Sequence, residues 1–246
     1  MRLLLLGGTS EASSLATVLA GLGIDAVFSY AGVTRRPKAQ PLPTRTGGFG
    51  GVPGLVAYLR TEAITHVIDA THPFAAQMSR NAVAACAEAG VALTAFERPP
   101  WPPRPGWTRV PDMDAAIAAL PEQGARVFLA IGKQQVDAFA ARPGNFYLLR
   151  MIDPPEAPPA LPDHACVVGR GPFTQAGDRA LMQAHGITYL VAKNGGSDSA
   201  VAKLDAADAL GVRTVMIDRP VTPDRTVCHD EATILRWLGH ETDLGV

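Results

Sequence analysis

Short runs of apolar residues alternate with amphipathic segments along the whole chain. In the first half the apolar runs have the length of β-strands and are residues 2–6, 25–30, 43–47, 66–70 and 92–96. Between these runs, apolar residues recur every three or four positions, as from Leu15 to Leu22. A parallel pair of strands needs a crossover connection, usually a helix. The alternation therefore predicts an α/β fold built on parallel strands.

A proline-rich stretch interrupts this pattern once. Residues 97–106, ERPPWPPRPG, contain five prolines, which exclude a helix or a central strand and indicate a linker. Beyond it the pattern restarts, with strands predicted at 107–110, 126–131, 145–149, 165–169, 188–192, 213–217 and 225–228, and helices at 113–120 and 231–239. We expect two Rossmann-like parallel-sheet domains, residues 1–100 and 101–246, with a cleft between them. Ligands of such sheets bind at the carboxyl ends of the strands.

Charge, cysteine content and missing motifs exclude several classes of protein. A formal net charge of -1 leaves no basic field for nucleic acid or an anionic membrane. Cys86, Cys166 and Cys228 are far apart, which argues against a zinc ribbon or a disulfide framework and favours a reducing compartment. The sequence contains no membrane-span run, signal-peptide pattern, G-x-S-x-G, H-E-x-x-H or Walker motif. We expect a cytoplasmic protein without a metal site.

The loop after the first predicted strand resembles a phosphate-binding turn. Residues 7–12 read GGTSEA, which matches the first glycine and the small sixth residue of G-x-G-x-x-G/A. Gly7 and Gly8 let a ligand approach the backbone, and the helix that follows presents its positive N-terminus to a phosphate. Thr9 replaces the middle glycine, and its hydroxyl and that of Ser10 are candidate donors to phosphate. The alternative is a structural turn of an α/β domain.

The end of the second predicted strand indicates which dinucleotide binds. An NAD site usually has an acidic residue here, but the chain has Ser29 and Tyr30, followed by Arg35 and Arg36. Guanidinium groups suit the additional 2′-phosphate of NADP through charge-assisted hydrogen bonds. The segment therefore favours NADPH over NADH, with a solvated basic loop as the alternative.

Two further loops in the first half are candidate ligand sites. The stretch 44–55 places Gly47, Gly48 and Gly50 around Phe49, a composition that suits a planar partner such as the nicotinamide or a conjugated substrate. A mobile glycine lid is the alternative.

The other loop is DATHPF, residues 69–74, which follows a buried strand with Thr71, His72 and Phe74 at its mouth. His72 is a candidate proton source or a capping residue, and Asp69 is most simply a satisfied strand-end carboxylate. No second histidine, cysteine or carboxylate stands at metal-ligand spacing.

In the second half, cations follow four of the predicted strands. They are Lys133, Arg150, Arg170 and Lys193, which we expect to gather at one sheet edge and to bind a ligand with several carboxylates. The alternative is that they are ordinary surface residues. The glycine turns GRGPF and KNGGSDS also leave open that a phosphate binds in this half instead.

Taken together, the motifs resemble one family over nearly the whole chain. They are, in order, GGTSEA, GGFGG, DATHPFAAQMSRNA, ERPPW, GRGPF, KNGGSDSAVAKLDAADALG and IDRP. This series resembles the precorrin-6A reductase family of cobalamin biosynthesis. The chain departs from the family pattern at Asn194, where a serine is expected before the glycines, and at Lys133, where a small polar residue is more common.

The resemblance implies NADPH-dependent reduction of one double bond of precorrin-6A, a tetrapyrrole with many carboxylates, to precorrin-6B. It implies that Arg35 and Arg36 bind the 2′-phosphate, that GGFGG and THPF line the hydride-transfer region, and that the cations of the second half pair with substrate carboxylates. The proton then comes from water or from an acid such as His72. Alternatives are a tetrapyrrole methyltransferase that uses S-adenosylmethionine, a cofactor without a phosphate for the arginines, and a non-enzymatic dinucleotide-binding module.

Overall fold

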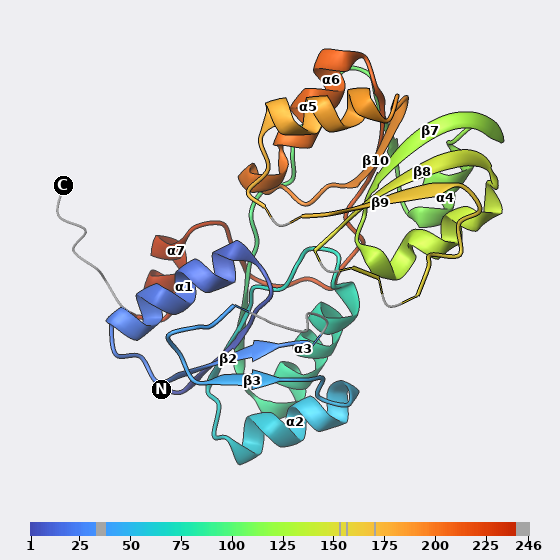
Figure 1. The fold of residues 1–246 in the computed structure, drawn as a ribbon. Helices are drawn as coiled ribbons and strands as arrows, with labels where there is room; N and C mark the ends of the chain where they lie inside the picture. Colours follow the sequence, from blue (N-terminus) through green and yellow to red (C-terminus); the bar gives the residue numbers. More distant parts are fainter. Residues whose placement is uncertain (33–37, 153, 156, 170, 240–246) are drawn as a thin grey trace. The chain divides into compact units, whose positions relative to one another are not determined.

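The computed structural model describes residues 1–32, 38–152, 154–155, 157–169 and 171–239, and it divides the chain into two compact units (Figure 1). The first unit contains Met1–Pro99 and the chain from Val221 onward. The second unit is Pro100–Pro220. Each unit is described by itself.

The first unit contains a six-stranded parallel sheet in the order β12-β5-β4-β1-β2-β3. Its strands are β1 (Leu3–Leu6), β2 (Ala26–Tyr30), β3 (Thr44–Thr46), β4 (His66–Asp69), β5 (Ala92–Phe96) and β12 (Val227–Cys228). Its helices are α1 (Ser10–Gly21), α2 (Gly51–Thr61), α3 (Ala76–Ala89) and α7 (Glu231–Trp237).

Strand β1 shows why the opening leucines form a central strand. All four leucines are at most 1% exposed, as expected of a parallel strand covered on both faces. Leu3 and Leu5 pack with residues of α1 and α7 on one face, and Leu4 and Leu6 pack with residues of α2 and α3 on the other. Figure 1 shows α1 and α2 on opposite sides of this sheet.

The second unit contains another six-stranded parallel sheet, in the order β6-β11-β10-β7-β8-β9. Its strands are β6 (Trp107–Val110), β7 (Gln123–Ala130), β8 (Gly144–Met151), β9 (His164–Val168), β10 (Tyr189–Lys193) and β11 (Arg213–Ile217). Its helices are α4 (Met113–Ala118), α5 (Gln175–Ala184) and α6 (Ala202–Leu210), and its short 3₁₀ helices are η1 (Lys133–Ala141) and η2 (Asp198–Ala200).

The first sheet has the 3-2-1-4-5-6 strand order of the Rossmann fold, and in the second sheet β7 to β11 follow the order 3-2-1-4-5 with β6 in the sixth position, which confirms the predicted fold class. The strand order reverses between β1 and β4 in the first sheet and between β7 and β10 in the second. In the first unit the sixth strand, β12, comes last in the chain, whereas in the second unit the sixth strand, β6, comes first. The carboxyl ends of β1 and β4, and of β7 and β10, are therefore the positions where ligands of such sheets bind.

The observed division differs from the expected domains 1–100 and 101–246 at its C-terminal end. The segment from Val221 returns to the first unit, where β12 pairs with β5 and α7 buries Ile234 and Leu235 in the core. A strand of two residues carries no hydrophobic pattern that indicates which sheet it joins. The expected cleft between the domains stays a prediction. Among the described helices, none combines the length and the apolarity that a membrane crossing requires.

Candidate functional site

The two glycines after β1 are required for different reasons. Gly7 is buried, and a Cβ added there would lie 2.1 Å from the ring of Phe28, so the close approach of strand and loop excludes a side chain. Gly8 is exposed and has a φ of +128°, which favours glycine, and nothing lies within 4 Å of a Cβ built on it. The backbone at Gly8 is therefore open to a ligand at the point where the strand order reverses.

Thr9 connects the loop to the other side of this reversal. Its hydroxyl accepts a hydrogen bond from the N–H of Ala12 at 3.1 Å, which caps α1, and donates to the carbonyl of Ala70 after β4 at 2.9 Å. A hydroxyl has one proton to donate. The Thr9 hydroxyl is thus engaged within the protein in this conformation, and its expected bond to a phosphate stays a prediction. The backbone of the loop still fits that ligand.

A carboxylate lies at the N-terminus of α1. Glu11 accepts from the Ser10 hydroxyl at 3.1 Å and from Nη1 of Arg98 at 2.5 Å, so the Ser10 hydroxyl, the other predicted phosphate donor, is engaged as well. Burial raises the pKa of Glu11, but hydrogen bonds from Arg98 and from its own backbone N–H outweigh burial and leave the pKa below its ordinary value. Arg98, in the ERPPW motif, supplies a positive charge beside the glycine loop that the sequence alone did not indicate.

A buried ionic cluster supports the DATHPF loop. Asp69 is 1% exposed and accepts from the Thr71 N–H at 3.2 Å, the Thr71 hydroxyl at 2.7 Å, the Ser79 hydroxyl at 2.6 Å and Nη1 of Arg225 at 2.9 Å. Arg225 also pairs with Glu97. This confirms the interpretation of Asp69 as a satisfied strand-end carboxylate. The Thr71 hydroxyl, expected to contact substrate, is oriented toward Asp69.

His72 is exposed at the mouth of β4. Its Nδ1 accepts the backbone N–H of Phe74 at 3.2 Å, so the neutral ring carries its proton on Nε2. The two rings lie 5.8 Å apart. The contact fits the capping alternative, and the role of His72 as a proton source stays a prediction.

The end of β2 is joined to the neighbouring strand β3 through Arg45. Ser29 is 4% exposed, and its hydroxyl accepts from Nη1 of Arg45 at 2.8 Å. The Tyr30 hydroxyl donates to the carbonyl of Lys38 at 2.8 Å and accepts from Gln40 at 2.5 Å. The predictions for Arg35 and Arg36 lie outside the described residues.

Arg45 also organises the glycine loop. Its guanidinium donates to the carbonyls of Gly47 at 2.9 Å and Gly48 at 3.1 Å, and its central carbon lies 3.9 Å from the ring centroid of Phe49. One face of Phe49 is therefore covered by Arg45, and the expected contact of this loop with a planar partner stays a prediction. Gly50 has a φ of +80° and precedes the first residue of α2.

Of the four cations predicted to bind substrate in the second unit, the three that the structure describes lie in different environments. Lys133 is exposed after β7, and Lys193 is half-buried at the end of β10, where burial lowers its pKa. These two strands are neighbours at the reversal of the strand order. Arg150 is 13% exposed, pairs with the buried Asp178 and stacks on Phe173 at 3.6 Å, so its charge is already compensated. The position expected for Arg170 lies outside the described residues.

Asn194 explains one departure from the family pattern. Its side-chain oxygen accepts the N–H of Trp101 at 2.8 Å, and its amide donates to the carbonyl of Trp101 at 3.2 Å. A serine has a single hydroxyl and is too short to make both bonds with this geometry. The amide thus fixes Trp101, the last residue of the ERPPW motif, to the KNGG loop within the second unit.

Lys203 is a buried cation that the sequence interpretation missed. It is 8% exposed, donates to the carbonyl of Ala200 at 2.8 Å and lies 5.6 Å from the ring centroid of Trp101. Burial lowers its pKa to about 8, and the positive charge of Arg150 acts in the same direction. No sequence signal distinguishes Lys203 from a solvent-facing helical lysine, because its burial depends on Trp101 in a distant segment.

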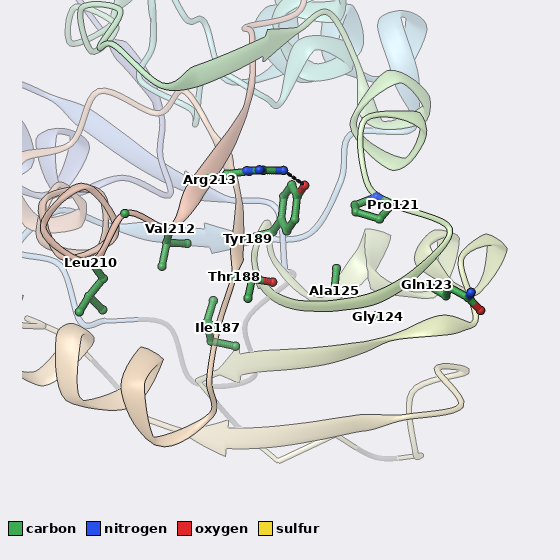
Figure 2. A pocket seen from close by; sticks show the side chains of 11 residues that line it. Pro121, Gln123, Gly124, Ala125, Ile187, Thr188, Tyr189, Leu210, Val212 and Arg213 are labelled. Carbon is green, nitrogen blue, oxygen red and sulfur yellow. Dashed lines mark hydrogen bonds between the residues drawn. The ribbon is translucent and has the colours of Figure 1, made fainter.

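A groove of about 470 Å³ lies elsewhere in the second unit (Figure 2). It is lined by Gln123, Tyr189 and Arg213, which begin β7, β10 and β11, and Arg213 donates to the Tyr189 hydroxyl at 2.8 Å. The groove thus lies at the amino ends of the strands, opposite the edge where open α/β sheets bind ligands. It contains none of the predicted site residues. In the described part of the chain, no group of three or more His, Cys, Asp or Glu side chains is placed to hold a metal ion.

Two six-stranded parallel sheets, with an open glycine turn after the first strand of the first sheet, define the class of Rossmann-like α/β proteins. The chain belongs to the precorrin-6x reductase CbiJ/CobK family, whose profile matches residues 2–239. It is 60% identical to the precorrin-6A reductase of Rhodobacter capsulatus, over 96% of this chain and 95% of the relative. It is 46% identical to that of Rhodococcus erythropolis, over 97% of each. A solved structure of CobK precorrin-6A reductase superposes with a TM-score of 0.93 at 59% identity and covers 100% of both chains.

Proposed function

We propose that this chain is a precorrin-6A reductase of cobalamin biosynthesis that uses NADPH to reduce one double bond of precorrin-6A and forms precorrin-6B. The observation that carries the proposal is the open backbone at Gly8, at the strand-order reversal of a Rossmann sheet, in a chain that aligns over 95% of the length of a reductase relative. We assign the cofactor to the first unit and the tetrapyrrole to the second.

The residues present in the first unit fit a dinucleotide. The backbone at Gly8 and the N-terminus of α1 bind the pyrophosphate, and Arg98 offsets the negative charge of Glu11 beside them. Ser29 and Tyr30 lie at the end of β2, where the adenosine ribose of a Rossmann cofactor binds, and Arg35 and Arg36 supply charge for the 2′-phosphate.

Of the two loops expected to line the region of hydride transfer, THPF, with Thr71 and Phe74, keeps that assignment. The GGFGG loop, with Gly47, Gly48, Phe49 and Gly50, follows β3 beside the end of β2 and is assigned to the adenosine side of the cofactor. When bound, NADPH supplies the hydride. The chain holds the reacting groups in place, which is its main contribution to the rate. Asp69 fixes Thr71 and with it the loop that carries His72. The Nε2–H of His72, or water, delivers the proton that balances the hydride.

In the second unit, the substrate is a polycarboxylate and the matching groups are cations. Lys133 follows β7 and Lys193 ends β10, the two strands that flank the reversal of strand order, and we assign both to substrate carboxylates. Arg150 and Arg170 are assigned to the same role. Arg150 must then exchange its partner Asp178 for a ligand oxygen, or it acts indirectly by fixing α5, which carries Asp178, beside the site. The family relationship counts against the methyltransferase and the non-enzymatic module.

The direct test is an incubation of the purified chain with precorrin-6A and NADPH. We expect loss of the nicotinamide absorbance only when both are present, and a product heavier than the substrate by two hydrogens. Turnover with S-adenosylmethionine and a gain of one methyl group would contradict the proposal. Binding of NADPH without any change in precorrin-6A would support the module instead.

A further inference from the structure

Arg45 lies next to the predicted cofactor loop. Three neighbouring strands end side by side here, because the N–H of Gly7 after β1 donates to the carbonyl of Ser29 on β2 at 2.9 Å, and Ser29 is in register with Arg45 on β3. In a Rossmann sheet the end of the second strand is where the adenosine ribose and its 2′ substituent bind. The side chain of Arg45 reaches this strand end, since it bonds the Ser29 hydroxyl.

The charge of Arg45 is not compensated by a carboxylate. Its three hydrogen-bond acceptors are the Ser29 hydroxyl and the carbonyls of Gly47 and Gly48, all of them neutral. Within the described part of the chain, no Asp or Glu pairs with it. Arg98 and Arg225, at the same edge of the sheet, pair with Glu11 and with Asp69, respectively. Arg45 therefore keeps a positive charge that a bound anion can neutralise.

The guanidinium is also held in a fixed orientation. It lies 3.9 Å from the ring centroid of Phe49 and 5.2 Å from that of Tyr58. A guanidinium has five N–H groups. Three of them make the bonds to Ser29, Gly47 and Gly48, and among the described residues the other two have no partner. A flat, oriented fork with spare donors is suited to a phosphate monoester.

We propose that Arg45 binds the 2′-phosphate of the cofactor and determines the preference for NADPH over NADH. This inference rests on the proposed function. Arg45 thus joins Arg35 and Arg36 as a candidate ligand of the 2′-phosphate. Unlike an exposed side chain, it is already oriented by Ser29 and Phe49 before the cofactor binds. The ligand class is a ribose 2′-phosphate, and the GGFGG backbone serves as the support that orients the arginine.

The test compares the parent chain with Arg45→Met, Arg45→Lys and the control Arg60→Met. Arg60 is an exposed arginine in α2 whose guanidinium contacts the carbonyl of Glu88 at 3.4 Å. Its replacement by Met therefore removes the same charge from the same unit. Dissociation constants are measured for NADPH, NADH, 2′,5′-ADP and 5′-AMP, and thermal unfolding shows that each variant is folded.

In Arg45→Met we expect NADPH and 2′,5′-ADP to bind about 10- to 100-fold more weakly, as for loss of charge-assisted hydrogen bonds, while NADH and 5′-AMP change less than about threefold. Arg45→Lys keeps part of the discrimination, and Arg60→Met keeps all of it. If Arg45→Met weakens all four ligands equally, the residue only supports the loop and the inference is wrong. The inference also fails if discrimination is lost only on changing Arg35 and Arg36. Equal affinities for NADPH and NADH in the parent chain would instead contradict the proposed cofactor.

Discussion

Removal of the Arg225 side chain charge should destabilise the first unit far more than removal of an exposed arginine. Arg225 is 5% exposed and donates to Asp69, which is 1% exposed, at 2.9 Å. It also pairs with Glu97, which is 16% exposed. In Arg225→Met, Asp69 stays buried while the arginine that it shares with Glu97 is gone.

The expected cost follows from this burial. Breaking a buried ion pair from one side costs about 3–5 kcal/mol, because the remaining charge is left uncompensated in a medium of low polarity. The cost should fall on β12 and α7, since Arg225 lies just before β12 and fixes the returning segment to β4 and β5. Asp69→Asn combined with Arg225→Met should cost less than the sum of the two single changes, because the pair is then removed together.

Urea unfolding is monitored by hydrogen exchange of peptides from β4, β5 and β12, which separates this effect from changes in the second unit. The control is Arg109→Met, which breaks a two-bond pair with Asp218 at 2.9 and 3.0 Å that is 51% and 32% exposed. We expect at most about 1 kcal/mol for that exposed pair. Equal losses in the two variants, or a loss below about 1 kcal/mol for Arg225→Met, would refute the reasoning.

Three further predictions concern single positions. Gly7→Ala places a Cβ 2.1 Å from the Phe28 ring and should lower the free energy of unfolding by about 1–3 kcal/mol, whereas no loss in denaturant unfolding would show that the ring moves freely. Lys203→Met should raise the free energy of unfolding at neutral pH, because the folded-state pKa of Lys203, about 8, lies below its unfolded value. Burying the charged amine therefore costs the parent chain roughly 3 kcal/mol below pH 8, and this cost is relieved as the pH rises from about 8 to 10.5. Unfolding curves across that pH range test this, and a parent chain that loses stability relative to the variant as pH rises would contradict it. Asn194→Ser should lower the thermal midpoint through a loss of about 1–3 kcal/mol, because a buried backbone group of Trp101 loses its partner, and an unchanged midpoint would exclude that role.

The strands could be predicted from the sequence because a parallel strand that is buried on both faces is a short run of apolar residues, as in the four leucines of β1. The loop at Gly7 and Gly8 could be predicted because tight turns after such strands need glycine. The return of β12 to the first sheet could not, since two residues carry no pattern of their own.

The ionic part of the site was missed for a related reason. Arg45, Arg98 and Arg225 have partners 16, 87 and 156 positions away in the chain, and an arginine looks the same in sequence whether it is exposed or paired in a buried cluster. The sequence indicates the Thr9 hydroxyl as a phosphate donor because nothing in it reveals the bond to Ala70. That bond joins two loops that only the folded sheet brings together. Motif letters therefore identify the loops, whereas packing decides which donors in them remain available.

The central claim is that a nicotinamide cofactor held by this chain transfers hydride to the tetrapyrrole. The most direct measurement uses NADPH carrying two deuterium atoms at the nicotinamide C4 position, followed by mass spectrometry of the tetrapyrrole product. We expect one deuterium from the cofactor and one hydrogen from solvent in each product molecule. A reduced product that contains no deuterium, in a reaction that still depends on this chain, would contradict the account.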